Sequence, residues 1–229
     1  MTAREASRIR LGVAGLLLSG LLFAAGALLR GPDVMPTEPL ARFVAFVTAR
    51  HYTHGWYLVF AGQVFEALGF LGLYKYIAQK GAERTAFAGA MMSLVAALLI
   101  MPLFGLMAFT VPTLVHLAQA GYPQAIDAAS GYMTTPVSLA TMIVAGTLYC
   151  VGSILFGVAM WRSHAAPKVV AVLYALSAPL ISLTPNFTAQ LVGMACLIVS
   201  AAVLTIRAFS AASESAAPVT SATDPAVMG

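Results

Sequence analysis

Long apolar segments are the feature that most restricts how this chain can fold. Six of them follow one another, separated by short joints with polar residues, Pro or Gly, and they cover residues 11–29, 55–78, 86–111, 136–160, 169–184 and 188–206. A helix of about 20 apolar residues crosses the hydrocarbon core of a bilayer, whereas the strands of a membrane β-barrel alternate apolar and polar residues over about ten positions. The runs are continuous and rich in Leu and Ala. We therefore predict an all-α integral membrane protein with six transmembrane helices in one bundle.

The composition agrees with a membrane location and separates the chain into two parts. Hydrophobic residues make up 60% of the chain and charged residues 9%, and the mean hydropathy is +0.89. So little polar surface cannot coat a soluble domain. We expect residues 1–209 to form a single transmembrane domain in the lipid bilayer of a bacterial inner membrane, which the Ala-rich composition suits. Residues 210–229 are rich in Ala, Ser, Thr and Pro and are expected to be a disordered tail.

The first apolar run has two interpretations. A basic start followed by an apolar run and the small residues at 25–27 also occurs in cleavable export signals. The run at 11–29 is longer than a usual signal core, because at about 1.5 Å per residue it covers about 28 Å, close to a hydrocarbon thickness. We expect a retained helix, and cleavage would leave five spans.

Lys and Arg predict an orientation, because they favour the cytoplasmic side of short loops. With six spans and a cytoplasmic N-terminus, the cytoplasmic segments hold most of the 12 basic residues: Arg4, Arg8, Arg10, Lys75, Lys80, Arg84, Arg162, Lys168 and Arg207. The first outer loop holds the rest: Arg30, Arg42 and Arg50. Both termini are therefore expected in the cytoplasm. Since the basic residues flank spans and do not form one patch, a nucleic-acid partner is not expected.

The first outer loop contains an amphipathic segment, "TEPLARFVAFVTARHY". Thr37 is a candidate helix cap and Pro39 suits an early helical position. An apolar stripe with helical spacing follows, made by Leu40, Phe43, Val44 and Val47. We predict a short outer loop helix, either a connector along the membrane surface or a lid packed on the bundle.

Glu66 stands out because it lies at the middle of the second apolar run. With 3.6 residues per turn it shares one broad face with Gly55, Gly62, Gln63, Gly69 and Phe70. Glycines let a neighbouring helix approach closely, so this face should point into the bundle. An isolated charge at that depth costs roughly 2–3 kcal/mol or more, and burial favours the neutral acid.

Two roles for Glu66 follow from this position. It could bind a proton or a solute together with Gln63 one turn away, or it could stay protonated and fix helix packing through a hydrogen bond. Depth in the membrane suggests Tyr149 and Ser177 as partners from later helices. Ser177 precedes Pro179, which frees a backbone carbonyl about one turn earlier, near Tyr174 and Ala175.

Histidines supply one further candidate site. His51, His54 and His116 all fall on the predicted outer side, and together they could bind zinc or copper. No histidine lies near the middle of a span, which disfavours a haem held between the helices. The two cysteines form no CxxC pair, and no nucleotide-binding or hydrolase motif occurs.

Three classes of function remain after these exclusions. The preferred one is a small proton-linked solute transporter that uses Glu66 and binds a small molecule or ion, without a cofactor. The alternatives are a membrane-embedded metal or redox enzyme subunit and an accessory protein that packs against a membrane complex or a second copy of itself. Soluble-type enzymatic catalysis is disfavoured.

Overall fold

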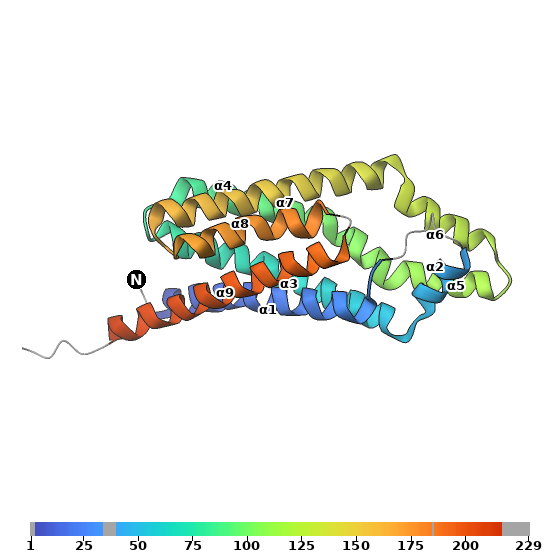
Figure 1. Cartoon of the computed structure of the whole chain (residues 1–229), viewed down its shortest axis with the longest axis horizontal. Helices are drawn as coiled ribbons and strands as arrows, with labels where there is room; N and C mark the ends of the chain where they lie inside the picture. The colour runs from blue at the N-terminus through green and yellow to red at the C-terminus, as the bar shows by residue number, and fades with distance from the viewer. Residues whose placement is uncertain (1–2, 34–39, 185, 217–229) are drawn as a thin grey trace, which may run out of the picture.

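The computed structural model describes residues 3–33, 40–184 and 186–216, and these residues are almost entirely helical, with no strand among them. The elements, labelled in Figure 1, are α1 (Ala3–Arg30), α2 (Leu40–Thr48), α3 (Arg50–Ala78), α4 (Glu83–Gly105), the π-helix η1 (Leu106–Thr110), α5 (Val111–Gln119), α6 (Gln124–Thr134), α7 (Pro136–Ser163), α8 (Lys168–Ser182) and α9 (Phe187–Ala216). The all-α prediction is confirmed. Of the predicted tail, residues 210–216 belong to α9, and residues 217–229 lie outside the described part.

Five helical stretches are long and apolar enough to cross a membrane: Arg4–Arg30, Arg50–Ala78, Glu83–Gln119, Pro136–Ser163 and Phe187–Ser210. The predicted span 169–184 appears as α8, which has 15 residues. At about 1.5 Å per residue α8 is about 22 Å long, shorter than a typical hydrocarbon core. The helices therefore support a membrane-embedded protein, while the length of α8 does not by itself establish a sixth crossing.

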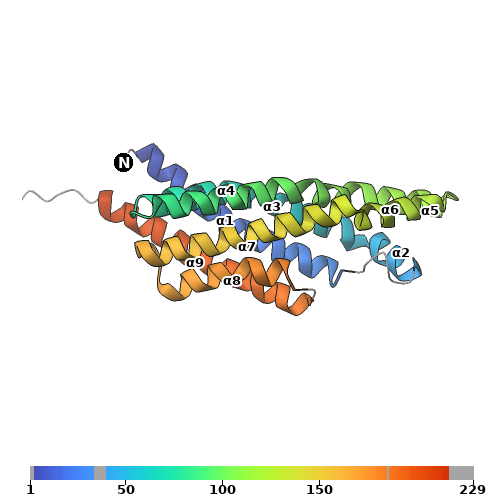
Figure 2. The same cartoon turned by 90° about the horizontal axis from the view of Figure 1, so that it is seen from above.

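Six long helices form a closed ring. Around it α1 contacts α3, α3 contacts α4, α4 contacts α7, α7 contacts α8, α8 contacts α9, and α9 returns to α1. The view in Figure 2 shows α8 and α9 on one side of this bundle and α4 on the other. Helices α3 and α7 are separated by α4 along the ring, so a contact between them lies in its interior. The buried core lies between these helices.

The close packing of α1 on α3 depends on glycine. A Cβ atom added to Gly72 would lie 2.5 Å from the Cα atom of Gly12, and one added to Gly26 would lie 2.6 Å from the carbonyl oxygen of Gly55. Real side chains do not tolerate such distances, so the two backbones touch because no side chain separates them. The predicted inward face of α3 is confirmed, since all six of its residues are buried.

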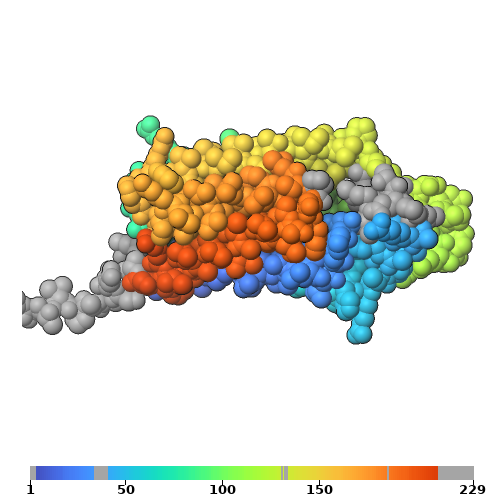
Figure 3. All heavy atoms as spheres, viewed as in Figure 1, coloured from blue at the N-terminus to red at the C-terminus, as the bar shows by residue number. Residues whose placement is uncertain are grey.

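Beyond the ring, the chain builds a helical extension, much of it in the joint between the predicted spans 86–111 and 136–160. Helix α4 continues through η1 into α5, and α5, α6 and α2 project past the end of α1 (Figures 1 and 3). The π-helix precedes Pro112, which has no N–H to donate, and the Val111 N–H bonds five residues back to the Leu106 carbonyl. The change to wider helical turns lets the chain continue as a helix despite the proline.

The predicted outer loop helix is confirmed as α2, although residues 34–39, including the proposed cap Thr37, lie outside the described residues. Phe43 and Val47 of its apolar stripe are buried, and α2 contacts α5 and α3. The stripe thus packs against protein, as a lid would, and does not lie on a lipid surface.

The two ends of the bundle differ in charge. The start of α1, the α3–α4 turn, the α7–α8 turn and the end of α9 lie together at one end, away from α2, α5 and α6 (Figure 1). We call this the basic end, because the nine basic residues expected in the cytoplasm lie on these segments. The remaining Arg30, Arg42 and Arg50 lie toward the opposite end.

Candidate functional site

Glu66 lies at the middle of α3 and is only 2% exposed. The glycines of its face bring α1 against α3 on one side, so the carboxyl group is held inside the ring and away from the lipid-facing surface. Within the described residues no basic side chain forms an ion pair with Glu66, and hydrogen bonds provide its polar contacts.

Two side chains donate hydrogen bonds to this carboxyl group. The Tyr149 hydroxyl, on α7, donates to Oε1 over 2.5 Å, and the Gln63 Nε2 amide, one turn earlier on α3, donates to Oε2 over 3.0 Å. Distances of about 2.5–2.7 Å are typical of hydroxyl hydrogen bonds to a charged oxygen. The structure therefore brings together three of the four residues predicted for this site.

An aromatic cluster covers the site on the side of the basic end. The ring of Phe70 lies 6.3 Å from that of Tyr149 and 6.1 Å from that of Phe156, centroid to centroid, and Phe156 meets Tyr174 edge-on at 6.0 Å. Phe70, Phe156 and Tyr174 are fully buried. Glu66 is buried beside this cluster, and in an environment of low polarity each hydrogen bond to its carboxyl group gains in strength.

The opposite end of the bundle has a second aromatic cluster, at the start of α3. Trp56 packs against Phe104 with ring centroids 5.6 Å apart, and the Arg30 guanidinium lies 4.0 Å from the Trp56 ring centroid. Tyr52 contacts Trp56 edge-on, and both side chains are buried. Buried aromatic side chains thus pack around α3 on both sides of Glu66 along the helix.

Ser19 of α1 adds a polar group at the same depth. A Cβ atom on Gly15 would lie 3.0 Å from the Phe65 carbonyl oxygen, and one on Gly62 would lie 2.8 Å from the Phe23 ring. Ser19 lies between Gly15 and Phe23 on α1, so it lies at the level of Glu66. Its hydroxyl is fully buried and, among the described residues, has no hydrogen-bond partner. Ser19 is not among the residues predicted for this site, although a serine at mid-depth on a glycine stripe is a usable sequence signal.

Ser177, the fourth predicted residue, is buried but hydrogen-bonds within its own helix. Its hydroxyl donates to the Tyr174 carbonyl over 2.7 Å, and no hydrogen bond links it to Glu66. Ser153 of α7 donates to the Ala175 carbonyl over 3.3 Å. The carbonyls that Pro179 was predicted to free are thus satisfied by serines, which gives Ser177 a structural contact.

The predicted outer metal site is not assembled. His51 and His54 lie in the first turns of α3 and His116 lies on α5, all with exposed side chains. The His54 Nδ1 atom pairs with the Arg50 carbonyl of its own helix at 2.9 Å. In the described part of the chain, no three His, Cys, Asp or Glu side chains are close enough to hold a metal ion together.

The arrangement around Glu66 can hold a single exchangeable proton at mid-depth in the bundle. An ionised carboxylate would accept from both donors, whereas a protonated carboxyl would itself become a donor and needs an acceptor. Ser19 lies at the same level, but no hydrogen bond joins its hydroxyl to Glu66 among the described residues. No protein-family model matches this chain, and comparison with curated proteins and with solved structures finds no match.

Proposed function

We propose that the chain is a small proton-linked solute transporter in which Glu66 is the proton-binding group. The observation that carries this proposal is the hydrogen bond from Tyr149 to Glu66 across the interior of the ring. It joins α3, which packs tightly on α1, to α7, which packs on α4 and α8. Because an ionisable group in a membrane span is costly, it is commonly retained for function.

The protonation state of Glu66 then sets how strongly the two sides of the ring are joined. The carboxylate holds Tyr149 through a charge-assisted hydrogen bond, which is roughly twice as strong as a neutral one. Protonation weakens this bond and loosens the direct contact of α7 with α3, while α4 still packs against both helices. A solute that binds better to one of the two arrangements is thereby linked to proton uptake, and the linkage is reciprocal.

The proposal includes the membrane that contains the protein and the side of that membrane on which each end of the bundle lies. The ring of α1, α3, α4, α7, α8 and α9 spans a bacterial inner membrane six times, with the basic end and both termini in the cytoplasm. The positive-inside rule supports this placement, because nine of the 12 basic residues lie at one end.

The test compares the wild type with Glu66→Gln in liposomes. Gln keeps the size of the side chain and its hydrogen-bonding capacity, so a loss of about 1 kcal/mol or less in stability is expected. Infrared difference spectra between acidic and alkaline pH should show the carboxyl C=O band of a buried acid in the wild type only. A thermal-shift screen of small solutes supplies the ligand, and its binding should depend on pH in the wild type but not in Glu66→Gln.

Glu83→Gln is the matched control, because Glu83 also lies 3.4 Å from a tyrosine hydroxyl, that of Tyr74, but is exposed. It should keep the buried-acid band and the pH-dependent binding. If Glu66→Gln keeps both as well, Glu66 has only a packing role and the transport proposal loses its basis.

A further inference from the structure

A basic hollow opens at the basic end, between the α3–α4 turn and the end of α7. It has a volume of about 420 Å³ and is lined by Lys80, Gly81, Ala82, Glu83, Arg84, Thr85, Arg162 and Ser163. Three basic side chains thus face the hollow together with one acid. The carboxyl group of that acid, Glu83, accepts a hydrogen bond from the Tyr74 hydroxyl. The positive charge of the hollow is therefore only partly balanced.

The hollow also receives the start of α4. Residues 83–85 form the first turn of this 23-residue helix, and its N-cap residue, Ala82, makes no side-chain hydrogen bond to the turn. The free N–H groups of a first turn and the positive end of the helix dipole favour a phosphate or carboxylate. Together with Lys80, Arg84 and Arg162, they provide the donors that a phosphate group needs.

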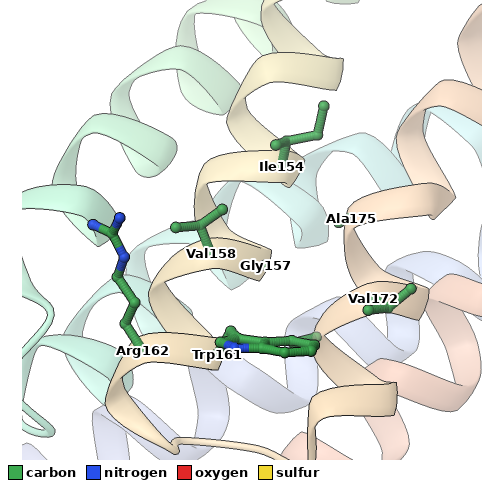
Figure 4. Close-up of a pocket in the computed structure, with 8 residues that line it drawn as sticks. Ile154, Gly157, Val158, Trp161, Arg162, Val172 and Ala175 are labelled. Atoms are coloured by element: carbon green, nitrogen blue, oxygen red, sulfur yellow. The ribbon is translucent and has the colours of Figure 1, made fainter.

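An apolar groove begins at the same arginine and runs into the bundle surface between α7 and α8. It has a volume of about 320 Å³, and its lining is Ile154, Gly157, Val158, Trp161, Arg162, Ala171, Val172 and Ala175. Figure 4 shows the Trp161 ring extending from α7 toward α8, which carries Val172, with Arg162 leaving α7 on the side away from Val172. A Cβ atom on Gly157 would lie 2.8 Å from the Ala171 carbonyl oxygen, so this glycine lets α8 form the opposite wall.

The basic hollow and the apolar groove match the two parts of one amphipathic molecule, an anionic group and a hydrocarbon chain. Arg162 lines both the hollow and the groove, and from Ile154 to Arg162 the groove follows α7 for about 12 Å at about 1.5 Å per residue. Lys168 adds a further cation beside the groove, with its Nζ atom 4.9 Å from the Trp161 ring centroid. A tryptophan flanked by basic residues is typical of the membrane–water boundary, where phospholipid headgroups lie.

We propose that this end of the protein binds an anionic phospholipid, with the phosphate in the basic hollow and one acyl chain in the α7–α8 groove. The site is distinct from Glu66 and does not depend on the transport proposal. We expect a lipid and not a free anion as the occupant, because the hollow shares Arg162 with an apolar groove whose lining includes the exposed residues Trp161 and Val172.

Native mass spectrometry and thermal unfolding of the detergent-purified full chain, with added phosphatidylglycerol or phosphatidylcholine, test this site. The wild type should retain phosphatidylglycerol, and the lipid should raise the unfolding midpoint. The double variant Arg84→Gln/Arg162→Gln should bind phosphatidylglycerol at least about tenfold more weakly, because two charge-assisted hydrogen bonds to the phosphate are removed. Arg8→Gln is the matched control, since Arg8 is exposed at the same end but lies on α1, outside the hollow.

Val158→Trp tests the groove by filling it, and should reduce phosphatidylglycerol binding while the fold is kept. Ile143→Trp is its control, since Ile143 lies on the same helix at 68% exposure and outside the groove. Equal binding of phosphatidylcholine, or equal losses in Arg8→Gln and the double variant, would overturn the charged site. Stabilisation by inorganic phosphate alone, or unchanged binding in Val158→Trp, would overturn the lipid as its occupant.

Discussion

At the residue scale, Glu66 is an acid to which the described residues supply hydrogen-bond donors but no paired cation. A carboxylate in such a place depends on directed hydrogen bonds, and the hydroxyl of Tyr149 and the amide of Gln63 provide them. Losing one donor leaves a buried oxygen without a partner, which costs more than the bond itself contributes. The contribution of each of these residues to stability can therefore be measured by substituting them singly and in pairs.

Tyr149→Phe removes the hydroxyl that reaches Glu66 and leaves the ring in place. The free energy of unfolding in detergent should fall by about 1–3 kcal/mol, because a buried acceptor loses its partner. In the double variant with Glu66→Gln the two losses should not add, with a coupling of about 0.5–3 kcal/mol, since the residues are in direct contact. Tyr74→Phe, which affects an exposed hydrogen bond to Glu83, should change stability by about 0.5 kcal/mol or less. Additive effects would mean that Tyr149 and Glu66 do not interact.

Most of the site was accessible to sequence reasoning, and the reason is geometric. Gln63 is three residues from Glu66 on one helix, so helical spacing alone brings the two together. Tyr149 was found because mid-span residues of different helices share one depth. Depth does not specify direction around a helix, so Ser177 was included although it points to the carbonyl of Tyr174. Direction depends on which helices are neighbours, which a single sequence does not reveal.

At the element scale, the α1–α3 pair depends on glycines that allow the two backbones to touch. The glycine-bearing face of α3 could be predicted from its spacing, but its partner could not. Gly12, Gly15 and Gly26 of α1 meet this face along its length. Lipid is as apolar as a leucine side chain, so close packing must supply much of the association energy in a membrane.

Gly72→Ala places a methyl group against the backbone of Gly12 and should destabilise the protein by about 1–3 kcal/mol, the usual cost of overpacking. Gly146→Ala on α7 is the control, because the nearest atom to its added Cβ is the Ser182 Cβ at 3.8 Å. There, the gain in helix propensity should leave stability equal or higher by up to about 1 kcal/mol. Thermal unfolding of both variants in the same detergent makes the comparison. A Gly72→Ala protein as stable as Gly146→Ala would show that α1 and α3 do not touch through their glycines.

The helices α5 and α6 were missed for a physical reason. They lie beyond the ring, where the chain needs no continuous apolar run, so hydropathy carries little signal there. The predicted third span ends at residue 111, just before Pro112, whereas η1 accommodates this proline and the helix continues to Gln119. By contrast, α2 could be predicted from the sequence, because the apolar residues that pack on the protein recur with the spacing of a helix.

At the scale of the whole molecule, the closed ring is a property that no single segment encodes. Neighbouring helices in sequence are mostly neighbours in space, but the closing contact joins α9 to α1. Gly20 makes this contact close, since its added Cβ would lie 2.9 Å from the Ile198 Cγ1 atom. Closure brings both described ends of the chain to the basic end (Figure 1).

Cysteine labelling tests the orientation in a background with Cys150→Ala and Cys196→Ala. Gln124→Cys on α6 and Gln79→Cys at the α3–α4 turn both replace exposed side chains at opposite ends of the bundle. In intact cells, a membrane-impermeant maleimide should label Gln124→Cys and spare Gln79→Cys, which should react only after permeabilisation. The reverse pattern would place the basic end outside and contradict the charge rule.

The length of α8 has a consequence for the lipids around the protein. This helix exposes Val169, Val172 and Leu176 on its outer side, yet its 15 residues cover only about 22 Å of a hydrocarbon layer of about 30 Å. Such hydrophobic mismatch costs fractions of a kcal/mol per ångström and is relieved when the bilayer thins locally. In the proposed six-span arrangement the bilayer should therefore be thinnest along α8, whereas longer helices of the ring, such as α3 with 29 residues, keep it thicker elsewhere.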